Sequence, residues 1–152
     1  MDPISHLLVT RLLVGSRPVD LVAGLAPDLP WYLLYPAWLA RSGQAREALS
    51  SGDWPMPPET IKRAHYVSHS LLTLALLWLL AKLARHDTHW AWSWLLHLLL
   101  DIPTHSRERM APRPLYPLSD WSHDGFSWAD GLTWVLMRLR RLFTRRQGAS
   151  QP

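Results

Sequence analysis

Two strongly apolar stretches of the chain each contain side chains that bind metal ions, and this combination limits what the chain can fold into. His69 opens the stretch HSLLTLALLWLLA, and His97 and Asp101 lie in the stretch WLLHLLLD. Burying a carboxylate is costly unless the group is paired or binds a cation. His97 and Asp101 are four residues apart, so they share one face of a helix. The sequence therefore predicts a helical metal site, since imidazole and carboxylate are the usual ligands of zinc, manganese or iron.

The composition restricts the chemistry of such a site. The chain has 152 residues, which is enough for one domain of ordinary size, and it contains no cysteine. Disulfides, cysteine-bound zinc and thiol catalysis are excluded, so a metal ion must be held by His, Asp or Glu. GxSxG, P-loop and GxGxxG patterns are also absent from the sequence. Serine-hydrolase and nucleotide-binding functions therefore have no support, and metal-assisted hydrolysis is the enzyme class that the residues favour.

Apolar periodicity and helix-start residues predict an all-α fold, a compact bundle of about five to six helices around a buried His/Asp cluster. Asp2 and Pro3 are typical of a helix start. A break is expected at residues 26–30, where two prolines flank Asp28, and a later helix is expected to end before Pro103. The expected helices cover residues 3–15, 18–25, 59–85, 90–102 and 131–143, with long irregular loops at 41–58 and 103–130.

We expect one domain over residues 1–143, followed by a disordered basic tail at 144–152. The formal net charge is +4, and five arginines crowd the end of the chain: Arg138, Arg140, Arg141, Arg145 and Arg146. Nucleic acid and anionic lipid both fit such a cluster, but the ten tryptophans favour lipid. Residues 69–84 and 90–100 are apolar but shorter than the roughly 20 residues that cross a bilayer. Short spans, re-entrant helices and attachment at the surface all stay open.

Each candidate ligand also has a simpler interpretation. His65 and His69 form an HxxxH pair whose imidazoles share a helix face, yet such a pair can equally face solvent or cap a helix. The pair of His97 and Asp101 can be a core hydrogen bond instead of a metal site. His105 follows Pro103, so we expect it to be a loop ligand or a group that supports the ligands.

Several segments in a fixed order resemble the small bacterial membrane-bound metal-dependent hydrolases. The segments are DPISHLL, LAPDLP, HYVSHSLL and HLLLDIPTHS, followed by PLYPLS, and together they cover about residues 1–120. The family pattern runs DPxTHxxxG, LxPDxD, HRGxTHSL and HLxxDxxT. The resemblance implies an α-helical protein of the bacterial inner membrane, with a fold similar to the zinc-dependent phospholipase C and nuclease group.

The resemblance also implies which residues bind metal. His6, Asp28, His69, His97 and Asp101 match family positions. His65 stands in an HxxxH pair where the family has HxxxxH, and Pro30 replaces the second Asp of the LxPDxD turn. Metal number and catalytic competence depend on these two departures.

Together these observations predict a membrane-associated, metal-dependent hydrolase that acts on a phosphoester or lipid-like substrate. Its expected ligands for one to three divalent ions, zinc first, are His6, Asp28, His65, His69, His97 and Asp101. Asp28 or Asp101 is expected to bridge ions or act as general base on water, whose pKa a metal lowers toward about 7. Arg107, Arg109 or Arg113 are candidates to bind a phosphate.

The rival is a non-catalytic membrane protein or adaptor whose His/Asp cluster is structural. A weaker rival is a nucleic-acid binder that uses the basic C-terminal helix, whereas we expect membrane lipid and no nucleic acid as partner.

Overall fold

The computed structural model describes residues 2–51 and 54–126, and this part of the chain contains helices and no strands. The predicted all-α class is confirmed. The predicted helix over 131–143 and the basic tail at 144–152 lie outside the described residues. In chain order the elements are α1 (Pro3–Leu13), α2 (Pro18–Leu25), the 3-10 turn η1 (Ala26–Asp28), α3 (Leu29–Arg41), α4 (Ala45–Ser51), α5 (Glu59–Ser68), α6 (Leu71–Leu83), α7 (Trp90–Thr104) and the 3-10 turn η2 (Arg107–Arg109).

The first helix starts where its capping residues predict. The carboxylate of Asp2 accepts hydrogen bonds from the backbone N–H of Ser5 at 2.9 Å and from its hydroxyl at 2.6 Å. Pro3 occupies the first turn, where its missing N–H costs nothing. The next helix, α2, likewise begins at a proline, Pro18.

The prediction of one continuous helix over residues 59–85 is wrong, because the chain bends by 54° between α5 and α6. The hydroxyl of Ser70 caps α6 by accepting from the N–H of Leu72 at 3.1 Å, and it donates to the carbonyl of Tyr116 at 2.6 Å. The N–H of Leu71 donates to the carbonyl of Pro114 at 2.9 Å. The loop that contains Pro114 and Tyr116 thus accepts hydrogen bonds at the point where a continuous helix would bond to its own carbonyls. The bend leaves His69 at the C-terminal end of α5.

The prolines interrupt the helices less than predicted. The expected break at residues 26–30 is only the single turn η1, which leads directly into α3. Helix α3 continues through Pro36, and α7 passes Pro103 and ends at Thr104. The hydroxyl of Thr104 bonds the carbonyl of Leu100 at 2.8 Å near that proline. The loop expected over 41–58 also contains a short helix, α4.

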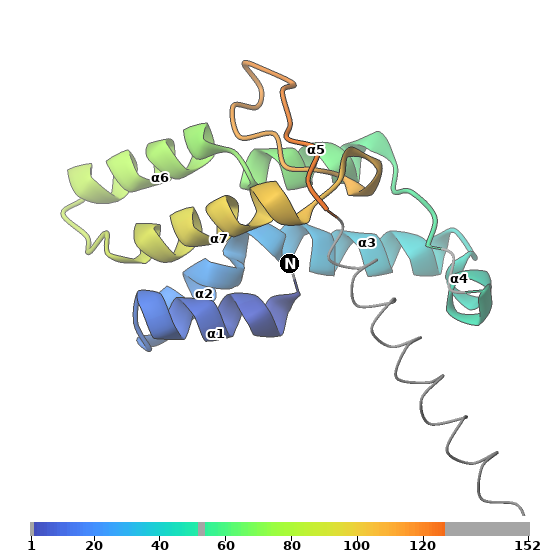
Figure 1. Cartoon of the computed structure of the whole chain (residues 1–152), viewed down its shortest axis with the longest axis horizontal. Coiled ribbons are helices and arrows are strands. Elements are labelled where there is room, and N and C mark those ends of the chain that lie inside the picture. The colour runs from blue at the N-terminus through green and yellow to red at the C-terminus, as the bar shows by residue number, and fades with distance from the viewer. Residues whose placement is uncertain (1, 52–53, 127–152) are drawn as a thin grey trace, which may run out of the picture.

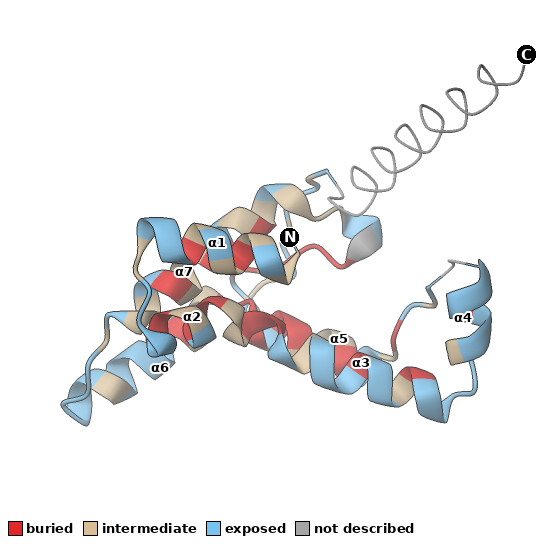
Figure 2. Cartoon of the chain, turned by 90° about the horizontal axis from the view of Figure 1, so that it is seen from below, coloured by how far each residue is buried: buried red, intermediate tan, exposed pale blue. Residues whose placement is uncertain are grey.

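The turn η1 lies where the helices meet. Helix α7 packs against α2 and α6, α1 packs against α2, and α3 packs against α5, while η1 contacts α2, α3, α5 and α7. Figure 1 shows α6 and α7 as an antiparallel pair beside α1 and α2. The buried residues in Figure 2 gather where α1, α2, α5 and α7 come together.

Polar side chains fill much of this buried region. Leu98 is the one large aliphatic side chain among the described residues that are less than 2% exposed. The polar members of that group are His6, Thr10, Asp20, His69, Ser70, Ser93, His97 and Asp101. A separate apolar cluster, formed by Tyr35, Leu39 and Ala48, joins α3 to α4. The candidate site residues are therefore also the centre of the fold.

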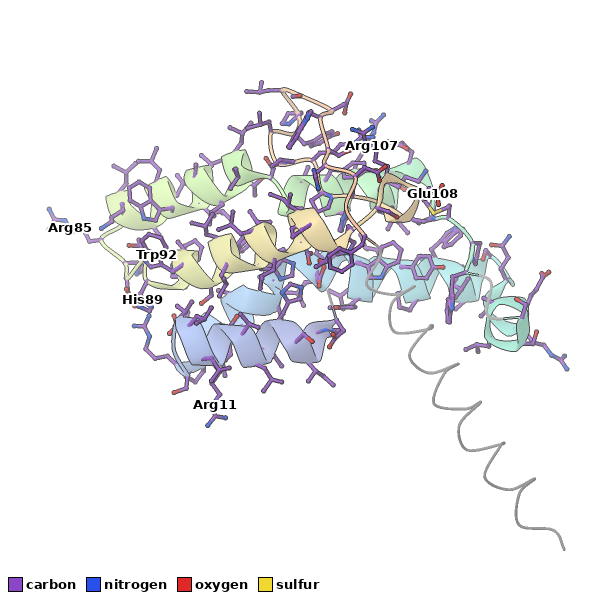
Figure 3. The ribbon with its side chains drawn as sticks, in the orientation of Figure 1. Arg11, Arg85, His89, Trp92, Arg107 and Glu108 are labelled. Atoms are coloured by element: carbon purple, nitrogen blue, oxygen red, sulfur yellow. The ribbon has the colours of Figure 1, made fainter. Side chains whose placement is uncertain are left out.

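Large apolar side chains cover outward faces of α1 and α6. They are Ile4, Leu8, Leu12 and Leu13 on α1, and Leu76, Leu77, Trp78, Leu79, Leu80 and Leu83 on α6. Arg11 and Arg85 extend outward from these two helical regions (Figure 3). Within the described residues no single helix is long and apolar enough to cross a membrane, although the bent pair α5–α6 meets the length and composition criteria when taken together.

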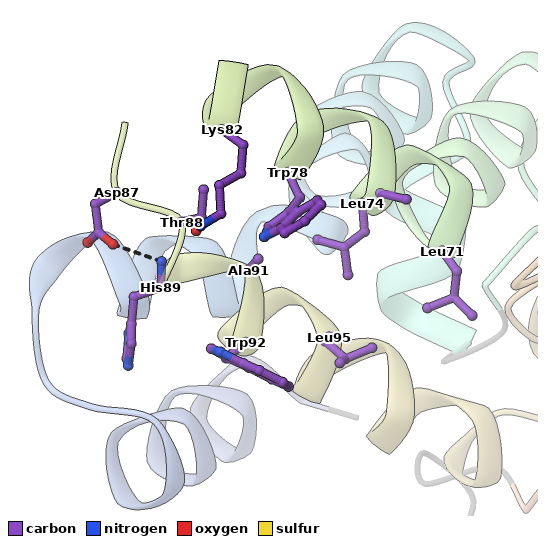
Figure 4. Close-up of a pocket in the computed structure, with 11 residues that line it drawn as sticks. Leu71, Leu74, Trp78, Lys82, Asp87, Thr88, His89, Ala91, Trp92 and Leu95 are labelled. Carbon is purple, nitrogen blue, oxygen red and sulfur yellow. Dashed lines mark hydrogen bonds between the residues drawn. The ribbon is translucent and has the colours of Figure 1, made fainter. Parts of the chain in front are cut away.

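A groove of about 680 Å³ runs between α6 and α7. Trp78 lines it from α6, and Trp92 and Leu95 line it from α7 (Figure 4). Lys82 and Thr88 lie at the end nearest the α6–α7 turn. The groove is therefore mainly apolar, with the polar side chains of Lys82, Asp87 and His89 at one end.

Candidate metal centre

Four side chains from three parts of the fold meet in the buried centre. His97 and Asp101 share one face of α7, His69 ends α5, and Asp28 ends η1. The side chains of His69, His97 and Asp101 are fully buried, and that of Asp28 is 11% exposed. Each of the four offers one ligand atom, and these atoms all lie within 4.8 Å of one another. The predicted convergence of His69, His97 and Asp101 is confirmed, and Asp28 joins them.

The distances between these ligand atoms are nearly uniform. Nε2 of His97 lies 3.1 Å from Oδ2 of Asp101 and 3.2 Å from Nε2 of His69. Nε2 of His69 lies 3.3 Å from Oδ2 of Asp101 and 3.4 Å from Oδ1 of Asp28. Nε2 of His97 lies 3.7 Å from the same Asp28 oxygen. Five of the six separations are thus close to those of a tetrahedron of ligand atoms around one ion, and the sixth, between the two carboxylates, is at most 4.8 Å.

The carbonyls at two helix ends orient the two imidazoles. Nδ1 of His97 donates to the carbonyl of Gly24, in the last turn of α2, at 2.7 Å. Nδ1 of His69 donates to the carbonyl of His65, in the last turn of α5, at 2.9 Å. Carbonyls in a last helical turn lack partners within their own helix. Because Nδ1 of each ring donates to a carbonyl, Nε2 is the nitrogen that faces the cluster, and it presents a lone pair whenever the ring is neutral.

The electrostatics of the cluster favour ionised carboxylates. Burial opposes ionisation of Asp101, but its contacts with His6, His69 and His97 hold the pKa of its carboxyl well below the usual range. Burial also opposes ionisation of Asp28, yet its interaction with His69 lowers the pKa to about 2. Two negative charges therefore lie in a nearly water-free centre.

Protons alone do not satisfy this arrangement. Burial disfavours the charged form of His69, but its hydrogen bonds with Asp101 and Asp28 raise the pKa of His69 to about 9. Burial lowers the pKa of His97, so this ring stays neutral. Its Nε2 lone pair then faces the Asp101 carboxylate at 3.1 Å with no proton between them. A cation among the four atoms would attract all of them and would offset the negative charge of the two carboxylates.

The cluster also fits a metal ion by size. The edge of a tetrahedron is 1.63 times its centre-to-corner distance, so zinc bonds of about 2.0–2.1 Å place ligand atoms about 3.3 Å apart. The five separations given above run from 3.1 to 3.7 Å. Two imidazoles and two carboxylates are a suitable donor set for zinc, and also for manganese or iron.

His6 supports Asp101 from α1 and is not part of the four-atom group. Its Nε2 lies 3.1 Å from Oδ1 of Asp101, the carboxylate oxygen that is not among the four ligand atoms. Since an ionised carboxylate can only accept, Nε2 of His6 is the donor. The His6 ring also stacks on His97, with centroids 3.7 Å apart. His6 therefore fixes which oxygen Asp101 directs at the centre.

His65 likewise lies beside the group of four. Its ring packs 3.9 Å from that of His69, and burial holds the pKa of His65 well below its usual value. Neither ring nitrogen has a hydrogen-bond partner among the described residues. The HxxxH spacing predicted two rings directed at one ion, whereas the observed link is the His65 carbonyl, which orients His69.

The remaining predicted residues lie around the centre. Nδ1 of His105 is 3.2 Å from the carbonyl of Asp101 and 3.6 Å from its Oδ1, so His105 is at the edge of the cluster. Arg107 donates to the carbonyl of Ser122. Arg113 pairs with Asp120 and stacks over Tyr66. Both arginines are thus engaged within the 105–126 loop.

Tyr32 is a functional candidate that sequence reasoning missed. Its hydroxyl donates to Oδ2 of Asp28 at 3.1 Å from one turn further along the chain, in α3. The spacing of four residues in the sequence PDLPWY is the signal that would have shown it, provided that residues 28–32 were recognised as helical.

Comparisons of the chain with protein-family models, with curated proteins and with solved structures found no match. The geometry of the metal centre is therefore the main basis on which the function of this protein can be inferred.

Proposed function

We propose that this protein is a membrane-associated hydrolase that depends on a divalent metal ion, zinc in the first place, held by Asp28, His69, His97 and Asp101. One observation carries the proposal: four ligand atoms lie within 4.8 Å of one another in a buried centre, five of their six separations are 3.1–3.7 Å, and the contact between His97 and Asp101 has no proton to share. The segments that resemble membrane-bound metal-dependent hydrolases contain all four residues, which supports hydrolysis of a phosphoester or lipid-like substrate.

A divalent ion in this site supplies Lewis acidity, which polarises the scissile group and makes water acidic enough to react near neutral pH. The chain positions the reaction around it. Asp101 is a fixed ligand, because His6 holds one of its oxygens and the fully buried carboxylate cannot reach solvent. Asp28 is the ligand that solvent reaches, and it is ionised at neutral pH. Of the two acidic residues, Asp28 is therefore the one placed to accept a proton from water.

A second candidate is the non-catalytic role, in which the ion only stabilises the fold. The specific observation in its favour is that the protein itself offers four ligand atoms within 4.8 Å of one another, and structural zinc sites are closed by four protein ligands. The partial exposure of Asp28 favours catalysis, since a purely structural site gains nothing from an edge open to water.

The outward apolar faces of α1 and α6 support membrane attachment. Patches of exposed apolar side chains larger than a few hundred Å² are rare on soluble monomers and mark contacts with proteins or membranes. Lys82 and Arg85 at the end of α6 are suited to anionic headgroups.

Metal content of purified protein, with and without Asp101→Asn, tests the proposal. The asparagine keeps the side-chain shape but removes the charge that offsets the cation, so metal occupancy and hydrolysis of bis(p-nitrophenyl) phosphate should both fall. Asp87→Asn is the matched control, because Asp87 is 58% exposed and contacts Arg17 outside the centre. Wild-type protein without bound metal, or full occupancy in Asp101→Asn, would refute the metal site. Full occupancy in the wild type without any hydrolysis would favour the structural role.

Vesicle sedimentation tests attachment. Replacing Leu79 and Leu83 on α6 by serine should weaken binding to vesicles that contain phosphatidylglycerol. The control is Leu118→Ser, which replaces an even more exposed leucine in the 105–126 loop. Equal binding of all variants would contradict attachment through α6.

A further inference from the structure

The two carboxylates of the centre differ in how firmly they are held. Asp101 is fully buried, with His6 on one oxygen and the imidazoles of the centre on the other. Asp28 lies at the only part of the four-residue group that solvent reaches, with 11% of its side chain exposed. Water or substrate that approaches the four ligand atoms must therefore arrive beside Asp28.

The two oxygens of Asp28 have different partners. Oδ1 belongs to the four ligand atoms, at 3.4 Å from Nε2 of His69. Oδ2 accepts the hydrogen bond from the Tyr32 hydroxyl at 3.1 Å. Tyr32 is itself 37% exposed, so it lies at the same solvent edge. This division leaves one carboxylate oxygen for the ion and draws the other away from it.

We infer that Tyr32 is the positioning residue that keeps Asp28 a one-oxygen ligand and thereby preserves a free coordination position at the solvent edge. Carboxylates bind metal ions through one oxygen or through both. A zinc ion with four ligand atoms reaches five during reaction, so the site needs room for one more. If Asp28 bound through both oxygens, it would fill the place that water or a substrate oxygen must take. This inference rests on the proposed metal site.

The chemistry of the two groups fixes the direction of this hydrogen bond. An ionised carboxylate can only accept, so the Tyr32 hydroxyl is the donor to Oδ2. A carboxylate oxygen that accepts this hydrogen bond has one lone pair fewer to offer to an ion.

The test compares Tyr32→Phe with wild type after loading with Co²⁺, whose visible d–d bands are intense with four ligand atoms and weaker with five. The wild type should give intense bands, which weaken when azide is added as a fifth ligand. In Tyr32→Phe the freed Oδ2 should bind the ion, so the bands start weak and azide changes them little. Cobalt should still bind at the wild-type ratio, since all four ligand residues remain.

Tyr35→Phe is the matched control. Tyr35 lies on the next turn of α3 and donates to the carbonyl of Pro55 at 2.9 Å, so its loss removes a comparable hydrogen bond away from the centre. Its spectrum and azide response should equal those of the wild type. Identical spectra and azide responses in Tyr32→Phe and wild type would overturn the role of Tyr32 while leaving the metal site intact. Failure of the wild type to bind cobalt would instead overturn the metal site itself.

Discussion

Gly24→Ala tests whether the contact between α1 and α2 sets the geometry of the metal centre. A Cβ atom at Gly24 would lie 2.5 Å from Oγ1 of Thr10 and 3.2 Å from its Cβ and Cγ2. Thr10 is only 2% exposed on α1, so it has no free space to move into. Restoring an ordinary contact of 3.4 Å requires about 0.9 Å of separation between the two helices. That displacement also moves the carbonyl of Gly24.

Two effects of different size should follow. Overpacking of this kind costs about 1–3 kcal/mol in the free energy of unfolding. For a chain of this length about 2–4 °C is lost per kcal/mol, so the melting temperature should fall by about 2–12 °C. The carbonyl of Gly24 accepts from Nδ1 of His97 at 2.7 Å. Loss of such an orienting hydrogen bond typically weakens metal binding by about 10–100-fold.

Thermal unfolding in the presence of a chelator measures the packing effect, and competition titration with a zinc dye measures the affinity. The double variant Gly24→Ala/Thr10→Ala removes the atoms at the 2.5 Å contact and one of those at 3.2 Å. It should be more stable than the sum of the two single substitutions predicts, and it should recover part of the zinc affinity. Gly24→Ala with wild-type stability and affinity, or strict additivity in the double variant, would show that this close approach does not control the site.

Three further predictions concern charge and metal. Asp20→Asn should cost about 1.5–3 kcal/mol, because the buried carboxylate loses its charged hydrogen bonds to Arg17, whose own side chain is 47% exposed. Asp87→Asn should cost less, because Asp87 is 58% exposed. Both acids lie 2.7 Å from Arg17, so equal losses in urea unfolding would contradict the role of burial. Hydrogen bonds from Arg17 hold the pKa of Asp20 in the folded protein below its usual value. The ionised carboxylate therefore stabilises the fold at pH values above about 3.9, the pKa of Asp in the unfolded chain. This stabilisation is lost as the pH falls through the lower pKa of the folded protein. The difference in melting temperature between wild type and Asp20→Asn should therefore shrink below about pH 4, and a constant difference would contradict the shift. Zinc at 100 times its dissociation constant should add about 2.7 kcal/mol to the free energy of unfolding, and calorimetry without any shift would contradict binding to the folded state.

The parts of the site that the sequence predicted are those set within one helix. His97 and Asp101 share a helix face by spacing alone, and their apolar surroundings predicted burial. Asp28 was selected by its two flanking prolines and by the resemblance, but its partner Tyr32 was missed because residues 26–30 were expected to break the helix. The burial of Asp20 was not predicted either. Its carboxylate forms an ion pair with Arg17 three residues earlier, and hydrophobic periodicity does not detect such a local pair.

Other features depended on contacts between distant segments. A serine ahead of an apolar run, as at Ser70, is a local signal for a helix start. The bend itself is held by two hydrogen bonds to the carbonyls of Pro114 and Tyr116, more than forty residues away. The donors are the N–H of Leu71 and the hydroxyl of Ser70. No spacing in the sequence reveals that pairing. The hydrogen bond from His69 to the His65 carbonyl could not be predicted either, because it depends on α5 ending at Ser68.

The bend at His69 explains how a chain with so polar a centre assembles its site. In a continuous helix, the side chains three and four positions later would lie on the same face as His69 and cover its ring. The end of α5 removes that next turn, so the ring faces Asp28 and α7 instead. The His65 carbonyl, which also accepts from the backbone N–H of His69, accepts from Nδ1 of that residue, and the carbonyl of Gly24 in the last turn of α2 accepts from Nδ1 of His97. Two helix ends thus direct two Nε2 atoms at two carboxylates, and the balance of charge in the core depends on the cation that we propose to bind there.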